Sequence, residues 1–131
     1  MKRIIIVDNE SSFRKGLRTI LENIGNVAYI EEATNGEEFL RMLLRKDFDL
    51  VFIDLKMPVM DGIEATKKAR EIYPELTIIA FSTYENEQYR KLMIDAGADE
   101  YLSKMNNNYD ALAEILAGTR HYAENNYLSH I

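Results

Sequence analysis

Three short segments of the chain are almost entirely apolar, with no alternation between apolar and polar positions. They span residues 4–7, 50–53 and 77–81, and they are rich in β-branched and aromatic side chains. This pattern is typical of the central strands of a parallel sheet, which are buried on both faces. Two more mixed segments, residues 27–32 and 100–104, are predicted to form the edge strands.

Amphipathic segments lie between and after the predicted strands, and each places its apolar residues on one helical face. The predicted inward-facing sets are Phe13, Leu17, Ile20, Leu21 and Ile24; Phe39, Leu40, Leu43 and Leu44; Tyr89, Leu92, Met93 and Ala96; and Leu112, Ile115 and Leu116. The third helix is predicted to run from Ile63 to about Ile72. Thr34 and Glu37 have the spacing of a capping box that opens the second helix. Asp61 is predicted to cap the third helix, Pro74 to stop it, and Gly97 to end the fourth.

A strand followed by a helix, repeated five times, predicts an α/β fold. Right-handed crossovers place helices on both faces of one doubly wound parallel sheet. Because the second and fifth strands are the least apolar, they belong at the edges, which gives the flavodoxin-like (βα)5 strand order 2-1-3-4-5. A dinucleotide-binding sheet is disfavoured, since no glycine-rich fingerprint follows the first strand.

Composition narrows the functional classes. The 131 residues include no cysteine, which excludes a disulfide framework, a cysteine nucleophile and a thiolate metal site. There are 16 Lys and Arg residues against 22 Asp and Glu residues and no basic stripe, so nucleic-acid binding by this chain is not expected. No segment has the length of a membrane span or of a signal-peptide core, and a cytoplasmic location is predicted.

Polar side chains follow four of the predicted strands. Asp8 ends the first strand, Asp54 the third, Ser82 the fourth and Lys104 the fifth. Each alone has an ordinary explanation as a turn residue or a surface charge. Together they occupy equivalent strand ends, and ligands of open α/β sheets bind beyond those ends.

These residue types suit phosphoryl transfer. Two neighbouring carboxylates, Asp8 and Asp54, repel each other unless positive charge lies between them, and Lys104 with an oxygen-preferring cation such as Mg²⁺ would supply it. A carboxylate can act as a nucleophile toward phosphorus, and the reaction depends on neutralising the phosphoryl oxygens. Asp54 is therefore the candidate acceptor, with Ser82 and Lys104 as contacts for the phosphoryl oxygens.

The same segments resemble the receiver domains of two-component response regulators. Residues 54–62 (DLKMPVMDG) resemble the signature loop of that family, residues 4–10 (IIIVDNE) its acidic first strand, and residues 96–104 (AGADEYLSK) the approach to its fifth strand. The resemblance covers residues 2–118. It implies that residues 1–118 form a receiver domain.

Residues 119–131 are interpreted as a C-terminal helical extension or linker. This segment loosely resembles the linker by which some regulators leave the receiver, so we expect a covalent output domain that is missing from this chain. The alternative is a single-domain receiver with a frayed helical end. The mass of the native gene product would distinguish the two.

The resemblance also implies a role for individual residues. These are Asp54 as the phosphoacceptor; Ser82 and Lys104 as the other catalytic contacts of the phosphoryl group; Asp8, Asn9, Asp54 and the backbone carbonyl of Lys56 as ligands of Mg²⁺; and Ser82 with Tyr101 as the switch pair. A sensor histidine kinase is the implied phosphoryl donor, and phosphorylation is expected to promote a homodimer or to release an output domain. The chain would catalyse only its own phosphorylation and dephosphorylation, and it is not expected to be a turnover enzyme.

The sequence departs from the family pattern at two positions. Asn9 stands where the family usually has a second aspartate, so an uncharged amide replaces a carboxylate at the metal site. Whether Asn9 or Glu10 completes that site stays open. Met105 stands where many members have proline after the lysine, and the peptide bond there is predicted to be trans.

Other functions remain as alternatives. Asn9 leaves open a pseudo-receiver, an interaction module with weakened Mg²⁺ binding. An aspartate-nucleophile phosphatase is disfavoured, because Lys56 stands where such enzymes carry a second acid. A flavodoxin would need a phosphate-cradling loop after the first strand, but Ser11 and Ser12 have no glycine beside them.

Replacing the amide at position 9 tests the metal interpretation. Asn9→Asp should tighten Mg²⁺ binding, because a carboxylate adds the charge that the amide lacks. Titration of the wild-type chain and the variant with Mg²⁺ measures the difference in affinity. Unchanged or weaker binding by the variant would contradict the interpretation.

Overall fold

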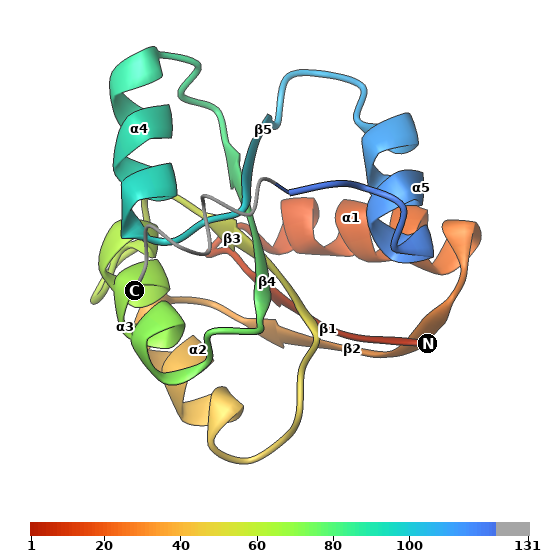
Figure 1. The fold of residues 1–131 in the computed structure, drawn as a ribbon, viewed down its shortest axis with the longest axis horizontal. Coiled ribbons are helices and arrows are strands. Elements are labelled where there is room, and N and C mark those ends of the chain that lie inside the picture. Colours follow the sequence, from red (N-terminus) through yellow and green to blue (C-terminus); the bar gives the residue numbers. More distant parts are fainter. Residues whose placement is uncertain (123–131) are drawn as a thin grey trace.

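The computed structural model describes residues 1–122, so most of the segment predicted as a helical extension or linker, residues 119–131, lies outside the described residues. Strands and helices alternate along the chain (Figure 1). They are β1 (Lys2–Val7), α1 (Ser11–Ile24), β2 (Val27–Ala33), α2 (Gly36–Leu43), β3 (Leu50–Asp54), α3 (Gly62–Ile72), β4 (Thr77–Ser82), α4 (Glu87–Ala96), β5 (Glu100–Ser103) and α5 (Tyr109–Ala117). The predicted order of elements is confirmed.

The five strands form one sheet in the order β2-β1-β3-β4-β5, and every neighbouring pair is parallel. This is the flavodoxin-like order predicted from the sequence. All residues of β3 are buried, whereas β2 and β5 are mostly half-buried. The less apolar segments therefore lie at the edges, as expected.

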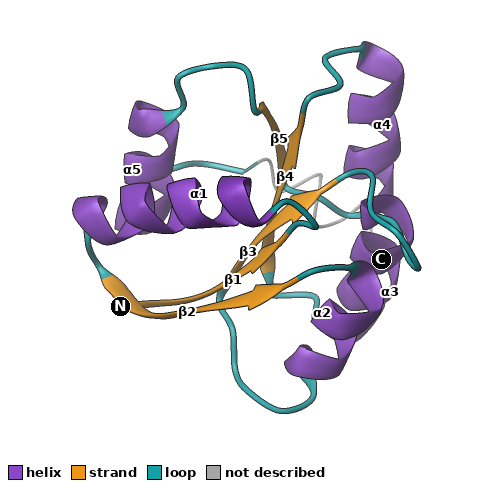
Figure 2. Ribbon diagram, turned by 180° about the vertical axis from the view of Figure 1, so that it is seen from behind, coloured by secondary structure: helices purple, strands orange, loops and turns teal. Residues whose placement is uncertain are grey.

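Helices cover both faces of the sheet. Helices α1 and α5 lie on one face, and α2, α3 and α4 lie on the other (Figures 1 and 2). Successive side chains of β1 point to opposite faces. Ile4 and Ile6 join the core beneath α1 and α5, while Ile5 and Val7 join the core beneath α2 to α4. Burial on both faces explains why the central strands are continuous apolar runs.

Polar side chains cap the beginnings of α2 and α3, as predicted, but the cap of α2 is the residue after the predicted one. Asp61 caps α3 as predicted, since its side chain accepts a hydrogen bond from the backbone amide of Glu64 at 2.9 Å. The capping box at Thr34 was predicted one residue too early. Asn35 caps α2 instead and accepts from the backbone amide of Glu38 at 2.9 Å. Because asparagine caps as well as threonine does, composition alone does not decide between these neighbours.

Three residues predicted to face inward are exposed. Leu44 is 76% exposed, because α2 ends at the residue before it and Leu44 follows as the C-cap. Ile20 and Leu92 lie at the margins of the apolar faces of α1 and α4, and both are exposed. The other residues predicted to face inward, except half-buried Ala96, belong to the two cores or pack against them.

Arg70 is a buried charge that the sequence pattern did not reveal. Its guanidinium donates to the carboxylate of Asp99 at 2.9 Å, to the carbonyl of Gly97 at 2.8 Å and to the carbonyl of Leu76 at 2.6 Å. The Asp99 carboxylate also accepts from the backbone amide of Ile78 at 2.9 Å. Arg70 therefore fixes the beginnings of β4 and β5, and losing one partner of such a buried pair costs about 3–5 kcal/mol.

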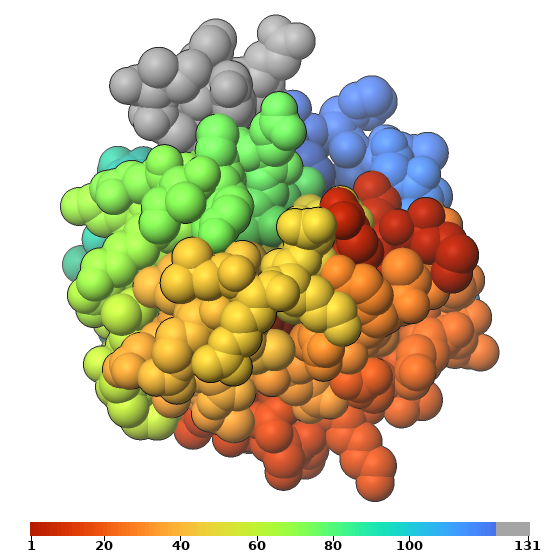
Figure 3. Space-filling model, turned by 90° about the horizontal axis from the view of Figure 1, so that it is seen from below, coloured from red at the N-terminus to blue at the C-terminus, as the bar shows by residue number. Residues whose placement is uncertain are grey.

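The described chain continues to pack after the last helix. Gly118 adopts a positive φ of 75°, which ends α5, and residues 119–122 form no helix. Arg120 donates to the carboxylate of Glu100 at the start of β5, and Tyr122 packs against the core beneath α1 and α5. In Figure 3 the first residues of the chain (darkest red) lie beside the end of the described chain (blue). Within residues 1–122, none of the helices has the length and apolar character needed to cross a bilayer.

Candidate functional site

The carboxyl ends of β1, β3, β4 and β5 place four polar residues at one rim of the sheet. Asp54 and Ser82 are the last residues of β3 and β4, Asp8 follows β1, and Lys104 follows β5. Their exposed fractions are low: 1% for Asp8, 8% for Asp54, 0% for Ser82, and 6% for the Lys104 side chain. Buried polar groups at a strand end need partners, and here they partly serve one another.

One ammonium group serves three carboxylates at this rim. Lys104 Nζ lies 2.6 Å from Asp8 Oδ2, 3.5 Å from Asp54 Oδ1 and 3.5 Å from Glu10 Oε1. Residues 96 positions apart in the chain are therefore in direct contact. Three acidic groups around one basic group leave an excess of negative charge when all of them are ionised.

The charge balance changes how Asp54 titrates. Burial, and then the negative charge of Asp8, raise the pKa of Asp54 to about 6. The charge of Lys104 and a hydrogen bond from the Leu55 amide at 2.9 Å act in the opposite direction and only partly offset this rise. Burial lowers the pKa of Lys104, but its hydrogen bond to Asp8 and the charge of Asp54 outweigh burial, so the pKa of Lys104 is raised. The lysine is therefore a cation, and the site still lacks positive charge.

Two of the predicted metal ligands, Asp8 and Asp54, lie at this rim. The Asp8 carboxylate is oriented by the backbone amide of Glu10, which donates to Oδ1 at 2.8 Å. Asn9 and Glu10 are exposed at the edge of the site. Among residues 1–122, no group of three or more His, Cys, Asp or Glu side chains is arranged to hold a metal ion. The predicted ligand set has two carboxylates, from Asp8 and Asp54, with the Asn9 amide where a further carboxylate would stand.

The loop after β3 approaches Asp54 closely. A side chain at Gly62 would place its Cβ 1.9 Å from the carbonyl oxygen of Asp54, so glycine is required there. The Gly62 amide donates to the carbonyl of Leu55 at 2.8 Å. The beginning of α3 is therefore held against the end of β3, and this contact fixes the backbone beside the candidate acceptor.

Ser82 and Tyr101 are both engaged with the loop between β4 and α4. The hydroxyl oxygen of Ser82 accepts a hydrogen bond from the backbone amide of Tyr84 at 2.9 Å. The hydroxyl of Tyr101 donates to the carbonyl of Tyr84. Tyr101 is half-buried against the core beneath α2 to α4. The predicted switch residues thus contact the same residue of one loop.

Aromatic contacts of two lysines were missed by the sequence reasoning. The Lys56 ammonium lies 5.2 Å from the ring centroids of both Tyr84 and Tyr89, while the Lys104 ammonium lies 4.2 Å from that of Phe13. Contacts of this length are cation–π interactions. Phe13 and Tyr89 were predicted only as residues on the apolar faces of helices. Their spacing in the sequence does not indicate a contact with a lysine from another element.

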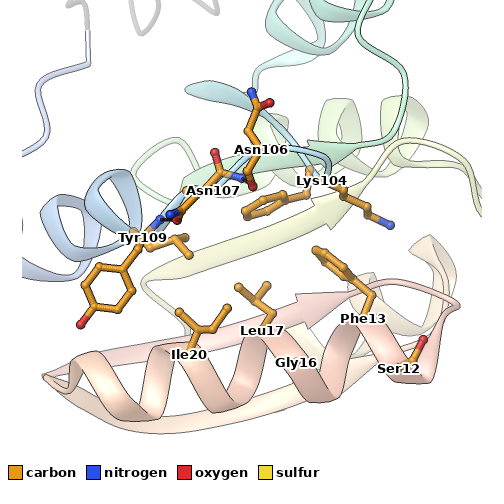
Figure 4. Close-up of a pocket in the computed structure, with 12 residues that line it drawn as sticks. Ser12, Phe13, Gly16, Leu17, Ile20, Lys104, Asn106, Asn107 and Tyr109 are labelled. Carbon is orange, nitrogen blue, oxygen red and sulfur yellow. Dashed lines mark hydrogen bonds between the residues drawn. The ribbon is translucent and has the colours of Figure 1, made fainter.

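A groove of about 330 Å³ begins beside Lys104. Phe13, Leu17 and Ile20 point into it from α1, and the loop with Asn106 and Lys104 forms the opposite side (Figure 4). The peptide bond between Lys104 and Met105 is trans, as predicted from the absence of proline. The groove lies next to the carboxylate cluster and is lined largely by apolar side chains.

The family model for the response regulator receiver domain matches residues 4–116. The chain belongs to this family. The receiver is 36% identical over 118 residues to the chemotaxis protein CheY of Halobacterium salinarum, and the match covers 88% of this chain and 97% of that protein. It is also 36% identical over 118 residues to an uncharacterized transcriptional regulatory protein, YhcZ, of Bacillus subtilis, covering 90% of this chain and 53% of that protein.

Solved structures agree with this assignment. A CheY-like receiver domain protein from Methanospirillum hungatei superposes with a TM-score of 0.80 at 31% identity, covering 91% of this chain and 94% of that one. A two-component response regulator of the LuxR family from Aurantimonas superposes with a TM-score of 0.83 at 28% identity, covering 99% and 95%. The receiver spans about half the length of several curated relatives, including 58% of the response regulator GacA of Pseudomonas viridiflava.

Neutralising Asp54 should stabilise the receiver in a pH-dependent way. The pKa of Asp54 rises from 3.8 to about 6 on folding, so its ionisation opposes folding once the pH exceeds about 4. Asp54→Asn should therefore increase the free energy of unfolding by about 2 kcal/mol at pH 8 and by almost nothing at pH 4.

Urea unfolding at both pH values measures this difference. Asp95→Asn, which removes an exposed carboxylate paired with Lys91, is the matched control and should have little effect at either pH. If Asp54→Asn increased the free energy of unfolding equally at both pH values, or decreased it at pH 8, the raised pKa of Asp54 would be contradicted.

Proposed function

We propose that this receiver accepts a phosphoryl group on Asp54 from a sensor histidine kinase in a Mg²⁺-dependent reaction. The observation that carries the proposal is the position of the Asp54 carboxylate. It lies at the buried rim, 3.5 Å from the Lys104 ammonium and beside a second carboxylate, Asp8, that raises its pKa. A nucleophile surrounded by too little positive charge suits a reaction that brings a phosphoryl group and a cation together.

The Asp54 carboxylate acts as the nucleophile. At neutral pH, above its pKa of about 6, it is mostly ionised. One of its oxygens bonds to phosphorus as the bond from phosphorus to the histidine nitrogen of the donor breaks, and that electron pair stays on the nitrogen. Lys104, already charged and within 3.5 Å of Asp54, stabilises the negative phosphoryl oxygens.

The donor set fits a magnesium ion. Asp8 and Asp54 supply carboxylate oxygens, Asn9 an amide oxygen and Lys56 a backbone carbonyl, and these are the oxygen ligands that Mg²⁺ prefers. The rise in the pKa of Asp54 caused by Asp8 is the repulsion that a cation relieves. When bound, the ion would supply positive charge toward the phosphoryl oxygens. Exposed Glu10, 3.5 Å from Lys104, is the alternative acidic group near the site.

Ser82 and Tyr101 form the proposed switch. The Ser82 hydroxyl leaves the Tyr84 amide and donates to a phosphoryl oxygen, and Tyr101 leaves the Tyr84 carbonyl and turns inward. Both contacts with Tyr84 are present in this structure, so each residue has a partner to exchange. The surface formed by α4, β5 and α5 changes as a result.

The receiver is proposed to act in the cytoplasm as one part of a response regulator. The matches cover only 53% of YhcZ and 58% of GacA, and the former is described as a transcriptional regulatory protein. This supports a covalent output domain beyond the receiver, controlled by release or by homodimerisation on phosphorylation. The proposed chemistry is the formation and loss of its own aspartyl phosphate, without turnover of another substrate.

Asn9 favours a second candidate function, that of a pseudo-receiver. With an uncharged residue among the ligands, a pseudo-receiver would keep the fold and the interaction surface but bind Mg²⁺ too weakly to be phosphorylated. The contacts of Lys104 with Asp8 and Asp54 favour the phosphorylated receiver, because a module that no longer binds phosphoryl groups has no need for them.

Acetyl phosphate with Mg²⁺ tests the two candidates. The wild-type chain should gain the mass of one phosphoryl group, and Asp54→Ala should gain nothing, because the acceptor oxygen is missing. Asp95→Asn, an exposed carboxylate change, should be labelled like the wild type. Mass spectrometry of the intact chain provides the measurement. An unlabelled wild-type chain would favour the pseudo-receiver, and a labelled Asp54→Ala variant would exclude Asp54 as the acceptor.

A further inference from the structure

The hydroxyl of Ser103 joins two loops that follow functional residues. It donates to the Glu85 carboxylate at 2.5 Å and accepts from the Met105 amide at 3.1 Å. Glu85 belongs to the loop after Ser82, and Met105 directly follows Lys104. One hydroxyl therefore links the segments that follow both proposed contacts of the phosphoryl group.

Ser103 and Glu85 differ in how firmly they are held. Ser103 lies in β5 and is the register partner of Ser82 in β4, so the sheet fixes its backbone. Glu85 is exposed and lies between β4 and α4. Within residues 1–122 its carboxylate has no ion-pair partner and accepts only the hydrogen bond from Ser103. This bond therefore ties the loop to the last residue of β5.

The proposed switch requires that loop to rearrange. The Ser82 hydroxyl now accepts from the Tyr84 amide, and Tyr101 donates to the Tyr84 carbonyl. When Ser82 turns to a phosphoryl oxygen and Tyr101 turns inward, Tyr84 loses both partners. Glu85 is the next residue, so its bond to Ser103 opposes any movement of the Tyr84 backbone.

We infer that the Ser103–Glu85 hydrogen bond is a latch that holds the β4–α4 loop in its unphosphorylated arrangement. Ser103 and Glu85 are positioning residues, because their side chains bond to one another and to the backbone after Lys104, and not to Asp54, Ser82 or Lys104 themselves. The inference rests on the proposed function, since it concerns the state that phosphorylation must overcome. A bond that is present in just one of two states shifts the equilibrium between those states by the free energy of that bond.

Removing either partner should favour the state that binds a phosphoryl mimic. Ser103→Ala and Glu85→Ala should each tighten binding of beryllofluoride, at saturating Mg²⁺, by about three- to tenfold, the effect of one exposed hydrogen bond to a charged group. The double variant should bind beryllofluoride no more tightly than either single variant, because each single substitution already removes the bond between Ser103 and Glu85. Ser103→Thr keeps the hydroxyl and should bind like the wild type.

Further variants separate the latch from a simple charge effect. Glu85→Gln keeps an oxygen acceptor without the charge, so its affinity should fall between wild type and Glu85→Ala. Glu87→Ala removes a nearby exposed carboxylate that pairs with Arg90, and it should change nothing. Affinity for Mg²⁺ alone should stay at the wild-type value in every variant, because the latch does not contact the proposed ligands.

Calorimetric titration with Mg²⁺ alone and then with beryllofluoride gives both affinities, and thermal unfolding shows that each variant is folded. A wild-type chain that does not bind beryllofluoride would refute the proposed function itself. If the wild type binds, unchanged or weaker binding by Ser103→Ala would overturn the latch. The latch would also be overturned if the two substitutions increased beryllofluoride affinity additively in the double variant. The same holds if Glu85→Gln and Glu85→Ala increased that affinity equally.

Discussion

The Lys104 ammonium lies among the carboxylates of Asp8, Asp54 and Glu10, and this shared cation is the interaction on which the rest of the site depends. Burying a carboxylate is unfavourable unless a positive group compensates it. At 2.6 Å, Asp8 receives the closest contact with the lysine, and Asp54 receives a longer one. Burial and this incomplete compensation together raise the pKa of Asp54, as the nucleophilic role proposed for it requires.

The fold brings this charge arrangement together from distant parts of the chain. Parallel strands all end at the same edge, so residues that follow β1, β3 and β5 become neighbours. Arg70 fixes the opposite ends of β4 and β5 through Asp99 and backbone carbonyls, and Gly62 lets α3 begin directly against the Asp54 carbonyl. The buried charge of Arg70 at the opposite end of the sheet is fully paired, while negative charge at the rim is only partly compensated. A site of this kind sacrifices some stability for reactivity.

Much of this arrangement could be predicted from the sequence. Continuous apolar runs, helical periodicity and polar residues at strand ends are local patterns, and they sufficed for the strand order and for the convergence of Asp8, Asp54 and Lys104. Contacts that depend on side-chain direction between distant elements could not be predicted. Arg70 has the appearance of a surface residue in a helix, and Ser103 and Glu85 have no pattern that pairs them.

The two wrong predictions at α2 both concern the ends of that helix. The cap of α2 moved from Thr34 to Asn35 because neighbouring polar residues compete for one position, and Leu44 became exposed because the helix ended one residue earlier than its periodicity suggested. Such single-residue shifts alter the ends of elements and leave the strand order unchanged. The site residues were insensitive to them, because they lie at the ends of buried strands whose registers are fixed by the core.

The most direct test of this account is the titration of the Asp54 carboxyl group itself. Carbon-13 NMR of the labelled aspartates, assigned by comparison with Asp54→Asn, measures its pKa with and without Mg²⁺. The account predicts a pKa of about 6 in the absence of the ion and a clear decrease when Mg²⁺ is added. A pKa near the ordinary value of 3.8 that does not respond to Mg²⁺ would contradict the central claim that the site lacks positive charge.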